Sequence, residues 1–348
     1  MLRFEKETFA ARIVLPTGET VARPIEIRTS PITGRTCRIA LTRGEEREPG
    51  AESLPAPPPF ADQTEHCPFC SQSLTARTPR LTADLWPPGR MTRGTSTLFP
   101  NLFPYGRYSA VSLFDDRHFV EIGTAERRGY IDSFLNCRDY LLRVLAHDPA
   151  AVYMAITQNH LPSAGGSLLH PHLQVQADRT PANHHRFLKR RAAEYHRWNG
   201  RLLFSDYLAA EMRSAERWIG VTGAWHWLSA FAPEGFHEIW GILPGVAGLN
   251  RVTPTQWESL AQGVLNAQRY FRSLGRNGYN LGLLLVEDGA QDLEMWVRIT
   301  VRSNYAPWVR SDFTGFEVAL GDMATFIEPE KTAEQARRFW EPPEGKMI

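Results

Sequence analysis

The stretch that decides the fold runs Gly165-Gly-Ser-Leu-Leu-His170-Pro-His172-Leu-Gln174. Two glycines and a serine precede a strand-length segment in which two histidines and a glutamine alternate with other residues. Successive side chains of a strand point to opposite faces, so we expect these three to share one face. Such a row suits a phosphoryl group, because the N–H groups of a glycine-rich turn approach its oxygens closely and the Ser167 hydroxyl adds a donor.

Transfer of a phosphoryl or nucleotidyl group by histidine has three requirements. The imidazole must be neutral and in line with the phosphorus, its tautomer must be fixed, and donors must meet the developing charge. The segment from Gly165 to Gln174 offers candidates for all three. The alternative is a pair of structural histidines on a sheet, in which case the glutamine and the glycine turn are coincidental.

A second motif, Cys67-Pro-Phe-Cys70, has the spacing of half a tetrahedral zinc site. The chain has four cysteines and no second CxxC, so we expect histidines to supply the other two ligands. His118 and His170 are the best placed. Zinc on His170 would stiffen the strand that presents His172. A redox role for the cysteine pair is the alternative.

The order of predicted elements around this strand returns later in the chain. The first unit has two strands, a helix and two strands, at residues 108–114, 119–122, 125–146, 151–158 and 168–176. The second has the same order, at residues 225–231, 238–243, 255–274, 279–286 and 293–301. The sequence therefore predicts an internal duplication, although this element pattern is also common without one.

Between the two units, residues 184–209 are charged and helix-prone. His184 and His185 follow Pro181-Ala-Asn at the start of this segment, and we expect them to be solvated at the beginning of a helix. A second metal or phosphate contact is the alternative reading of the two histidines.

Composition excludes several classes of protein. At 348 residues the chain exceeds the usual size of one hydrophobic core, so two domains are expected. With 39 basic and 38 acidic residues the net charge is +1, which provides no field for nucleic acid or an anionic membrane. We find neither a signal peptide nor the roughly 20 apolar residues of a membrane span, and we expect a cytoplasmic protein.

Taken together, these motifs resemble the galactose-1-phosphate uridylyltransferase branch of the histidine triad (HIT) superfamily, including its ADP-glucose phosphorylase-like members. That family carries Asn, then Gly-x-Ser, then His-Pro-His-x-Gln, and the matching residues are Asn159, Gly165, Ser167, His170, Pro171, His172 and Gln174. The CxxC matches the family's zinc cysteines, and residues 114–118 resemble the segment that carries its third zinc ligand. The resemblance covers about residues 25 to 340.

For the architecture, the resemblance implies a duplicated HIT-like α+β fold, with an antiparallel sheet in a half-barrel and helices packed on it. Residues 1–190 would form an N-terminal domain with the zinc site and His-Pro-His-x-Gln. Residues 191–348 would form a C-terminal domain with a degenerate motif. The resemblance also implies a homodimer whose active site is built across two chains.

For the reaction, the resemblance implies that His172 attacks the α-phosphorus of a nucleoside diphosphate sugar and expels sugar 1-phosphate. The nucleotide stays on the histidine until a sugar 1-phosphate or inorganic phosphate accepts it. Gln174 would bind the phosphoryl oxygens together with Ser167. The remaining implied substrate contacts are Arg43, Asn101, Asn159, Gly165, Gly166 and Glu317, the last of them to the sugar.

Two departures from the family pattern limit what is carried over. In bacterial uridylyltransferases the second copy has a His-x-His for a second metal, but residues 294–300 here read Glu-Met-Trp-Val-Arg-Ile-Thr, so one zinc per chain is expected. Residues 311–314, Ser-Asp-Phe-Thr, alter the expected hexose pocket. The competing functions are a dinucleoside polyphosphate phosphorylase or hydrolase that uses His172, and a non-catalytic, zinc-stabilised nucleotide-binding protein.

Overall fold

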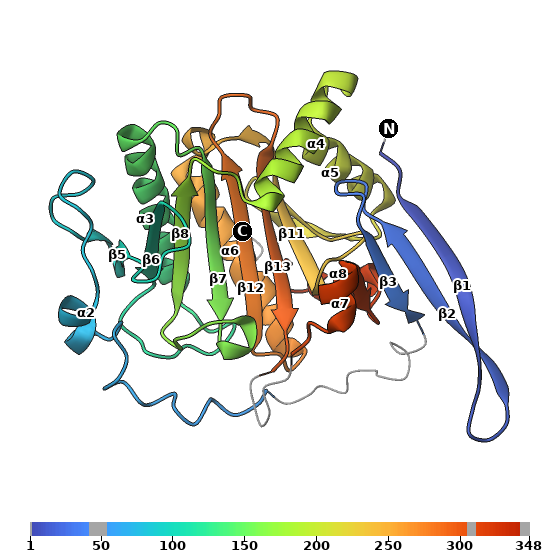
Figure 1. Ribbon diagram of the computed structural model, residues 1–348. Coiled ribbons are helices and arrows are strands. Elements are labelled where there is room, and N and C mark those ends of the chain that lie inside the picture. The colour runs from blue at the N-terminus through green and yellow to red at the C-terminus, as the bar shows by residue number, and fades with distance from the viewer. Residues whose placement is uncertain (1, 42–53, 305–310, 342–348) are drawn as a thin grey trace.

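The computed structural model describes residues 2–41, 54–304 and 311–341, which form two β-sheets with packed helices (Figure 1). The larger sheet has the order β4-β5-β6-β8-β7-β12-β13-β11-β10-β9, and all its neighbouring strands are antiparallel. Its strands are β4 (Met91–Arg93), β5 (Ser96–Pro100), β6 (Tyr108–Leu113), β7 (Tyr153–His160), β8 (His172–Asp178), β9 (Trp218–Thr222), β10 (Trp225–Ser229), β11 (Phe236–Ala247), β12 (Gly278–Val286) and β13 (Glu294–Arg302). The predicted α+β class and antiparallel sheet are confirmed, and the sheet is open.

The two halves of this sheet have the same strand arrangement, β4-β5-β6-β8-β7 from one edge to the centre and β9-β10-β11-β13-β12 from the other. β7 pairs with β12 in the middle, β8 and β13 flank them, and β6 and β11 follow. Each half therefore repeats one unit, as the predicted duplication requires. The predicted domain boundary between residues 190 and 191 falls inside helix α4 (Asn183–Asn199) and stays a prediction.

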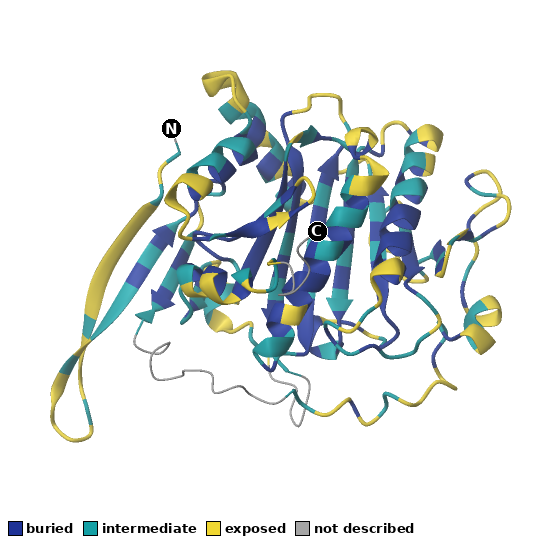
Figure 2. Ribbon diagram, turned by 180° about the vertical axis from the view of Figure 1, so that it is seen from behind, coloured by how far each residue is buried: buried dark blue, intermediate teal, exposed yellow. Residues whose placement is uncertain are grey.

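Two long helices cover one face of the sheet, one for each half, as the view from behind shows (Figure 2). They are α3 (Arg127–His147) and α6 (Pro254–Ser273), close to the predicted helices at 125–146 and 255–274. In α3 the 3.6-residue period buries one side, including Phe134, Leu141 and Val144. The start of α6 is fixed by a capping box between Thr253 and Gln256.

A buried hydrogen-bonded group joins the two halves beneath these helices. The hydroxyls of Tyr130 in α3 and Tyr279 in β12 lie 2.6 Å apart, within hydrogen-bonding distance of each other, and each also lies close to the Gln158 side-chain oxygen, at 3.0 and 2.8 Å. Gln268 of α6 donates to the Tyr130 hydroxyl at 2.7 Å. Because buried polar groups are costly when unpaired, this set favours one arrangement of the two copies.

The opposite face is partly covered by α4 and α5 (Leu203–Ser214), which pack on β12 and on β11 with β13. α4 begins where a helix start was predicted, but the solvation predicted for His185 is wrong. That imidazole is buried, and its Nε2 donates to the Met154 carbonyl at 2.7 Å. The other helical segments within residues 54–304 and 311–341 are α2 (Ser71–Arg77), η1 (Pro162–Ala164), η2 (Leu249–Arg251), α7 (Gly315–Leu320) and α8 (Pro329–Arg337).

A second, four-stranded sheet combines both ends of the chain. Its strands are β1 (Glu5–Val14), β2 (Thr20–Thr29), β3 (Thr36–Ala40) and β14 (Met323–Thr325), in that order. β1 and β2 form a long ribbon that projects beyond the body of the molecule (Figure 1), and β1 is almost wholly exposed (Figure 2). No strand was predicted for this part of the chain.

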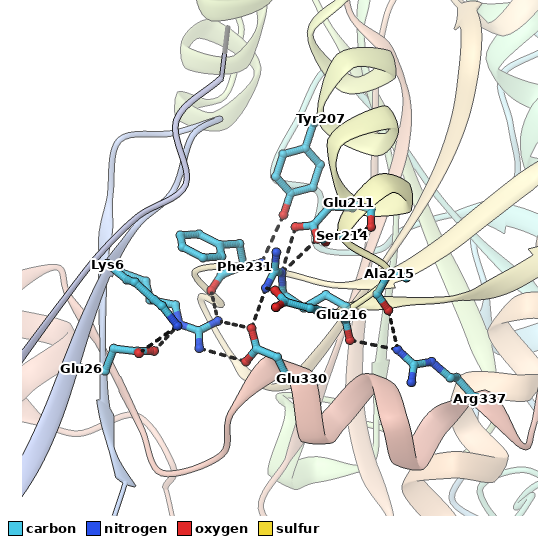
Figure 3. Close-up of polar contacts among 12 residues, drawn as sticks. Lys6, Glu26, Tyr207, Glu211, Ser214, Ala215, Glu216, Phe231, Glu330 and Arg337 are labelled. Carbon is cyan, nitrogen blue, oxygen red and sulfur yellow. Dashed lines mark hydrogen bonds and ion pairs between the residues drawn. The ribbon is translucent and has the colours of Figure 1, made fainter.

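An ion-pair network holds this smaller sheet against the rest of the molecule (Figure 3). The carboxylate of Glu330 in α8 receives two hydrogen bonds from Arg28 of β2, at 2.8 and 2.9 Å, and a third from Arg217 at 2.6 Å. Arg28 also donates to Glu26, and Arg217 donates to Glu211. Both arginines are nearly inaccessible to solvent.

Two local predictions are wrong. Residues 119–122 are not a strand, because the Ile122 carbonyl and the following Gly123 N–H bond to side chains of α6 instead of to a neighbouring strand. β8 begins at His172, four residues later than predicted, so His170 precedes the strand and does not share its pleat. Pro171 explains this late start, since it has no N–H to donate to a ladder.

None of the helices in the described parts of the chain is both long and apolar enough to span a bilayer.

Candidate active site and metal cluster

The first residue of β8, His172, is held in one tautomer. Its Nδ1 lies 2.8 Å from the His170 carbonyl oxygen, which can only accept, so Nδ1 carries the proton and Nε2 a lone pair. The side chain is buried, and burial lowers the pKa of His172 below the usual 6.5, with the hydrogen bond to His170 opposing this shift. The ring is therefore neutral at pH 7, as a nitrogen nucleophile must be.

Gln174 lies two residues further along β8 and so on the same face as His172. It is directly opposite Thr157 of β7 and Val111 of β6. The apolar residues that follow each of these two positions, Leu173 and Val175, are buried on the helix-covered face. The alternation predicted for this segment therefore holds from His172 onward.

The four predicted metal ligands come together. One ligand atom from each of Cys67, Cys70, His118 and His170 lies within 4.8 Å of the others. Cys70 Sγ lies 3.4 Å from His118 Nδ1 and 3.7 Å from His170 Nδ1, and Cys67 Sγ lies 4.0 Å from His170 Nδ1. Tetrahedral zinc would separate sulfur and nitrogen ligands by roughly 3.6 Å, so the donor set fits this ion.

His170 connects the metal cluster to His172. Its Nε2 lies 3.0 Å from the Asp115 carbonyl and donates to it, which leaves the Nδ1 lone pair for a metal on the cysteine side. Its own carbonyl accepts the proton of His172. Phe69, inside the CxxC, packs edge-on against both imidazoles, with ring centroids 6.1 Å from His170 and 5.4 Å from His172. The roles of Phe69 and Asp115 were not predicted from the sequence.

The glycine turn before this segment is compact. Gly165 has a φ of 87°, and a Cβ on Gly166 would lie 2.9 Å from the Asn159 carbonyl oxygen and 3.0 Å from that of Leu161. The N–H groups of Gly165 and Gly166 donate to the carbonyls of Pro162 and Leu161 within the loop. These two amides are thus engaged in shaping the turn, so the phosphate cradle predicted for them needs donors from elsewhere in the loop. The side chain of Ser167 is exposed.

Asn159 belongs to a chain of side chains that crosses the centre of the sheet. Asn280 of β12 is paired directly with Asn159 of β7 and donates to its side-chain oxygen at 2.7 Å. Arg302 of β13 donates to Asn280 at 2.7 Å. The contributions of Asn280 and Arg302 were missed from sequence, because they depend on the register between the two copies.

The other predicted substrate contacts lie apart from this centre or cannot be placed. Asn101 follows β5 and caps a turn by accepting from the Phe103 N–H, in a loop with exposed aromatic rings. Glu317 receives two hydrogen bonds from Thr314 in the capping box of α7, which lies beside β14 and away from β8 (Figure 1). The structure does not bring Glu317 to His172 within one chain. Arg43 lies outside the described residues.

The fold of this chain is similar to that of proteins with solved structures. The chain can be superposed on an ADP-glucose phosphorylase from Arabidopsis thaliana, solved with bound ADP-glucose, with a TM-score of 0.70 over 90% of this chain and 98% of that one. The chain therefore shares the fold of this phosphorylase. A uridylyltransferase matches this fold with a TM-score of 0.65 and the same coverage. The sequence identities are 17% and 16%.

A protein of Archaeoglobus fulgidus described as uncharacterized is 27% identical over 352 aligned positions, covering 97% of this chain and 99% of its own. No family model matches the sequence. The fold predicted by the family resemblance is therefore confirmed, and the solved neighbours are enzymes of nucleotidyl transfer and phosphorolysis by their names.

Proposed function

We propose that this protein is a nucleotidyltransferase that moves a nucleoside monophosphate from a nucleoside diphosphate sugar to a sugar 1-phosphate or to inorganic phosphate. The observation that carries this proposal is the state of His172: a buried, neutral imidazole whose Nδ1 proton is committed to the His170 carbonyl. That arrangement directs the free Nε2 lone pair toward an electrophile.

In the first step Nε2 of His172 attacks the α-phosphorus of the donor. A P–N bond forms, the P–O bond to the β-phosphate breaks, and sugar 1-phosphate leaves with the electron pair. The charge that develops on the ring is stabilised by the hydrogen bond from Nδ1 to the His170 carbonyl. In the second step a phosphate oxygen of the acceptor attacks the same phosphorus, and the P–N bond breaks to restore the neutral imidazole.

Gln174 and Ser167 are proposed to bind the nonbridging oxygens of the transferred phosphoryl group. Gln174 shares the face of His172, and its amide offers two N–H donors. Asn159, in hydrogen bond with Asn280, extends this polar surface toward β12. These side chains are uncharged hydrogen-bond donors. They suit the transferred phosphoryl group, because its charge changes little between the two steps of the reaction.

We propose one structural zinc ion on Cys67, Cys70, His118 and His170. When bound, the ion would hold the loop of the CxxC to the residue that precedes β8. Through His170 it would fix the carbonyl that sets the tautomer of His172. The ion would contact no substrate in this scheme.

We also propose a homodimer. The position of Glu317 on α7, away from β8, supports this, because the sugar contact implied by the family resemblance would then have to come from a second chain. Sedimentation velocity at micromolar concentration tests the proposal, with a monomer alone as the contradicting result.

The decisive experiment is covalent labelling. The protein is incubated with UDP-, ADP- and GDP-sugars labelled at the α-phosphorus, and we expect acid-labile, base-stable label from one of them. His172→Ala should abolish the label, and His147→Ala, at a half-exposed histidine near the end of α3, should retain it. No label on the wild type with any donor, or full label on His172→Ala, would exclude the proposed mechanism.

A further inference from the structure

Asn159 lies beside the proposed nucleophile. In the ladder between β7 and β8, Thr157 is paired with Gln174. One further step of two residues along the same register brings Asn159 level with His172. Side chains that lie opposite each other on neighbouring antiparallel strands share one face, with Cβ atoms about 4.5–5.5 Å apart. Asn159 is half-buried and accessible from that face, so a group carried by His172 is within reach of its amide.

The amide of Asn280 in β12 has a partner for both of its N–H groups and for its oxygen. Its Nδ2 donates to the Asn159 Oδ1 at 2.7 Å and to the Ala164 carbonyl at 2.8 Å. Its Oδ1 accepts from Nη1 of Arg302 at 2.7 Å. A backbone carbonyl can only accept and a guanidinium can only donate, so the Asn280 amide has one satisfied orientation.

This orientation decides which end of the Asn159 side chain is available. Because Asn280 donates to the Asn159 oxygen, the Asn159 Nδ2 is turned away from that contact. No acceptor for this nitrogen is found among residues 2–41, 54–304 and 311–341. Two N–H donors therefore remain for a phosphoryl oxygen. The reverse orientation would present a carbonyl oxygen to an anion, which is repulsive.

The same amide holds the glycine turn in place. Ala164, whose carbonyl Asn280 binds, ends η1 and directly precedes Gly165. The start of β12 packs closely on this turn, since a Cβ on Gly278 would lie 2.5 Å from the Ser163 Oγ. Asn280 therefore ties a loop of the first copy to a strand of the second.

Arg302 is held in turn by Asp312. Its Nε and Nη2 make three hydrogen bonds of 2.6 to 2.9 Å with the Asp312 carboxylate, which also accepts from the Ser303 N–H at 3.0 Å. The Arg302 guanidinium carbon lies 5.3 Å from the centroid of the Phe313 ring. Asp312 and Phe313 belong to residues 311–314, which depart from the family pattern. In this chain that segment anchors the arginine.

We propose that Asn280, Arg302 and Asp312 are positioning residues, which fix the Asn159 amide with its N–H groups toward the phosphoryl group on His172. The inference rests on the proposed function. Each of the three acts through its neighbour, from Asp312 to Arg302 to Asn280, and none has to touch the substrate. The second copy thereby takes part in the reaction without a His-Pro-His-x-Gln motif of its own.

The test measures recognition of the phosphate and needs no covalent step. AMP, UMP and GMP and the corresponding nucleosides are titrated into the zinc-loaded protein by calorimetry, and the pair that binds best is used for the variants. Asn280→Leu has a similar shape but no polar side-chain atom. We expect it to weaken the monophosphate by about tenfold and the nucleoside by less than about twofold.

A double-mutant cycle shows whether Asn280 acts through Asn159. In the Asn159→Ala background, Asn280→Leu should cost less than about threefold, because the amide that it positions is gone. Arg302→Met should weaken the monophosphate by about tenfold, and Arg302→Lys, whose ammonium can still donate to the Asn280 oxygen, should weaken it less. The matched control is Arg179→Met, which removes an arginine with three hydrogen bonds to Asp148 and should change neither affinity.

Thermal unfolding and zinc content establish that each variant is folded, and if Asn280→Leu is not, the cycle of Arg302→Met with Asn159→Ala takes its place. The inference is overturned if the variant weakens nucleoside and monophosphate equally, if its effect adds fully to that of Asn159→Ala, or if the wild type binds no monophosphate at about 10 mM. Covalent labelling of the wild type is scored separately. Monophosphate binding that depends on Asn280 through Asn159, without any label, would leave the positioning role assigned and remove the transfer mechanism.

Discussion

Replacement of Glu330 by glutamine should destabilise the protein strongly although the residue is remote from His172. Its carboxylate is the shared partner of Arg28 and Arg217. Burial alone would raise the pKa of Glu330, but hydrogen bonds and charge from the two arginines outweigh burial and lower it to about 2, against an ordinary 4.5. In the variant two nearly buried guanidinium groups lose a common negative charge.

The magnitude follows from that pKa. At about 1.36 kcal/mol for each tenfold change, a pKa of about 2 corresponds to about 3 kcal/mol of stabilisation by the ionised carboxylate. The Glu330 side chain is 30% exposed, so solvent screening reduces the figure to about 2 kcal/mol. Because the folded pKa lies below the unfolded one, this contribution is complete above pH 4.5 and is lost as pH falls from 4.5 toward 2.

Urea unfolding of wild type and Glu330→Gln at pH 7 and at pH 3.5 measures both effects. We expect a difference of about 2 kcal/mol at pH 7 that has shrunk measurably at pH 3.5. The matched control is Glu328→Gln on the same helix, where the partner Lys331 is half exposed and the expected loss is below about 0.5 kcal/mol. Equal losses in the two variants, or a Glu330→Gln difference that grows toward low pH, would refute the reasoning.

Three further predictions concern the active site. Cys67→Ser should lower bound zinc from about one per chain to nearly none and reduce labelling of His172 by at least about tenfold, measured by metal analysis and by the labelling assay. Because burial lowers its pKa below the ordinary 6.5, more than about half of the His172 rings are neutral at pH 6.5, so labelling at pH 6.5 should keep more than about half of its rate at pH 8 and should decline further in more acidic buffer. Gly166→Ala should cost about 1–3 kcal/mol in urea unfolding and slow labelling, since its Cβ would press on two carbonyl oxygens of the turn.

Each of these has its own control. Cys137→Ala removes a buried cysteine outside the metal cluster and should keep zinc. A labelling rate that rises tenfold between pH 6.5 and pH 8 would contradict a depressed His172 pKa. Gly282→Ala meets open space and should unfold at the same urea concentration as the wild type, so an equal loss in both glycine variants would remove the steric argument for Gly166.

Local motifs allowed the metal cluster to be predicted from sequence. The CxxC places two ligands within one turn, and His170 lies directly before the strand that the His-Pro-His-x-Gln motif predicts. The two long helices were predictable because their apolar residues recur with a period of 3.6. Pro171 was also visible in the sequence, but its effect on the start of β8 was not taken into account.

What could not be predicted depends on pairing between distant segments. Asn280 meets Asn159 only because β7 and β12 pair with one particular register across the centre of the sheet. Of the partners of Glu330, Arg28 comes from the opposite end of the chain and Arg217 from its middle, and β1 carries too little buried surface to produce an alternating pattern. Glu317 lies in a segment that resembles the family, but the sequence alone does not show whether this residue lies near His172 of its own chain.

His170 takes part in both the metal cluster and the hydrogen bond to His172, and this has a consequence for how the protein would become active in the proposed function. One residue gives its ring to the metal cluster and its backbone oxygen to the nucleophile. A newly made chain should therefore be active only after it has bound the metal ion. Oxidation of Cys67 and Cys70 would abolish activity even though neither cysteine contacts the substrate in the proposed scheme. The fraction of active protein in a preparation would then depend on the metal content and on the reduction of these cysteines, and not on the total protein concentration.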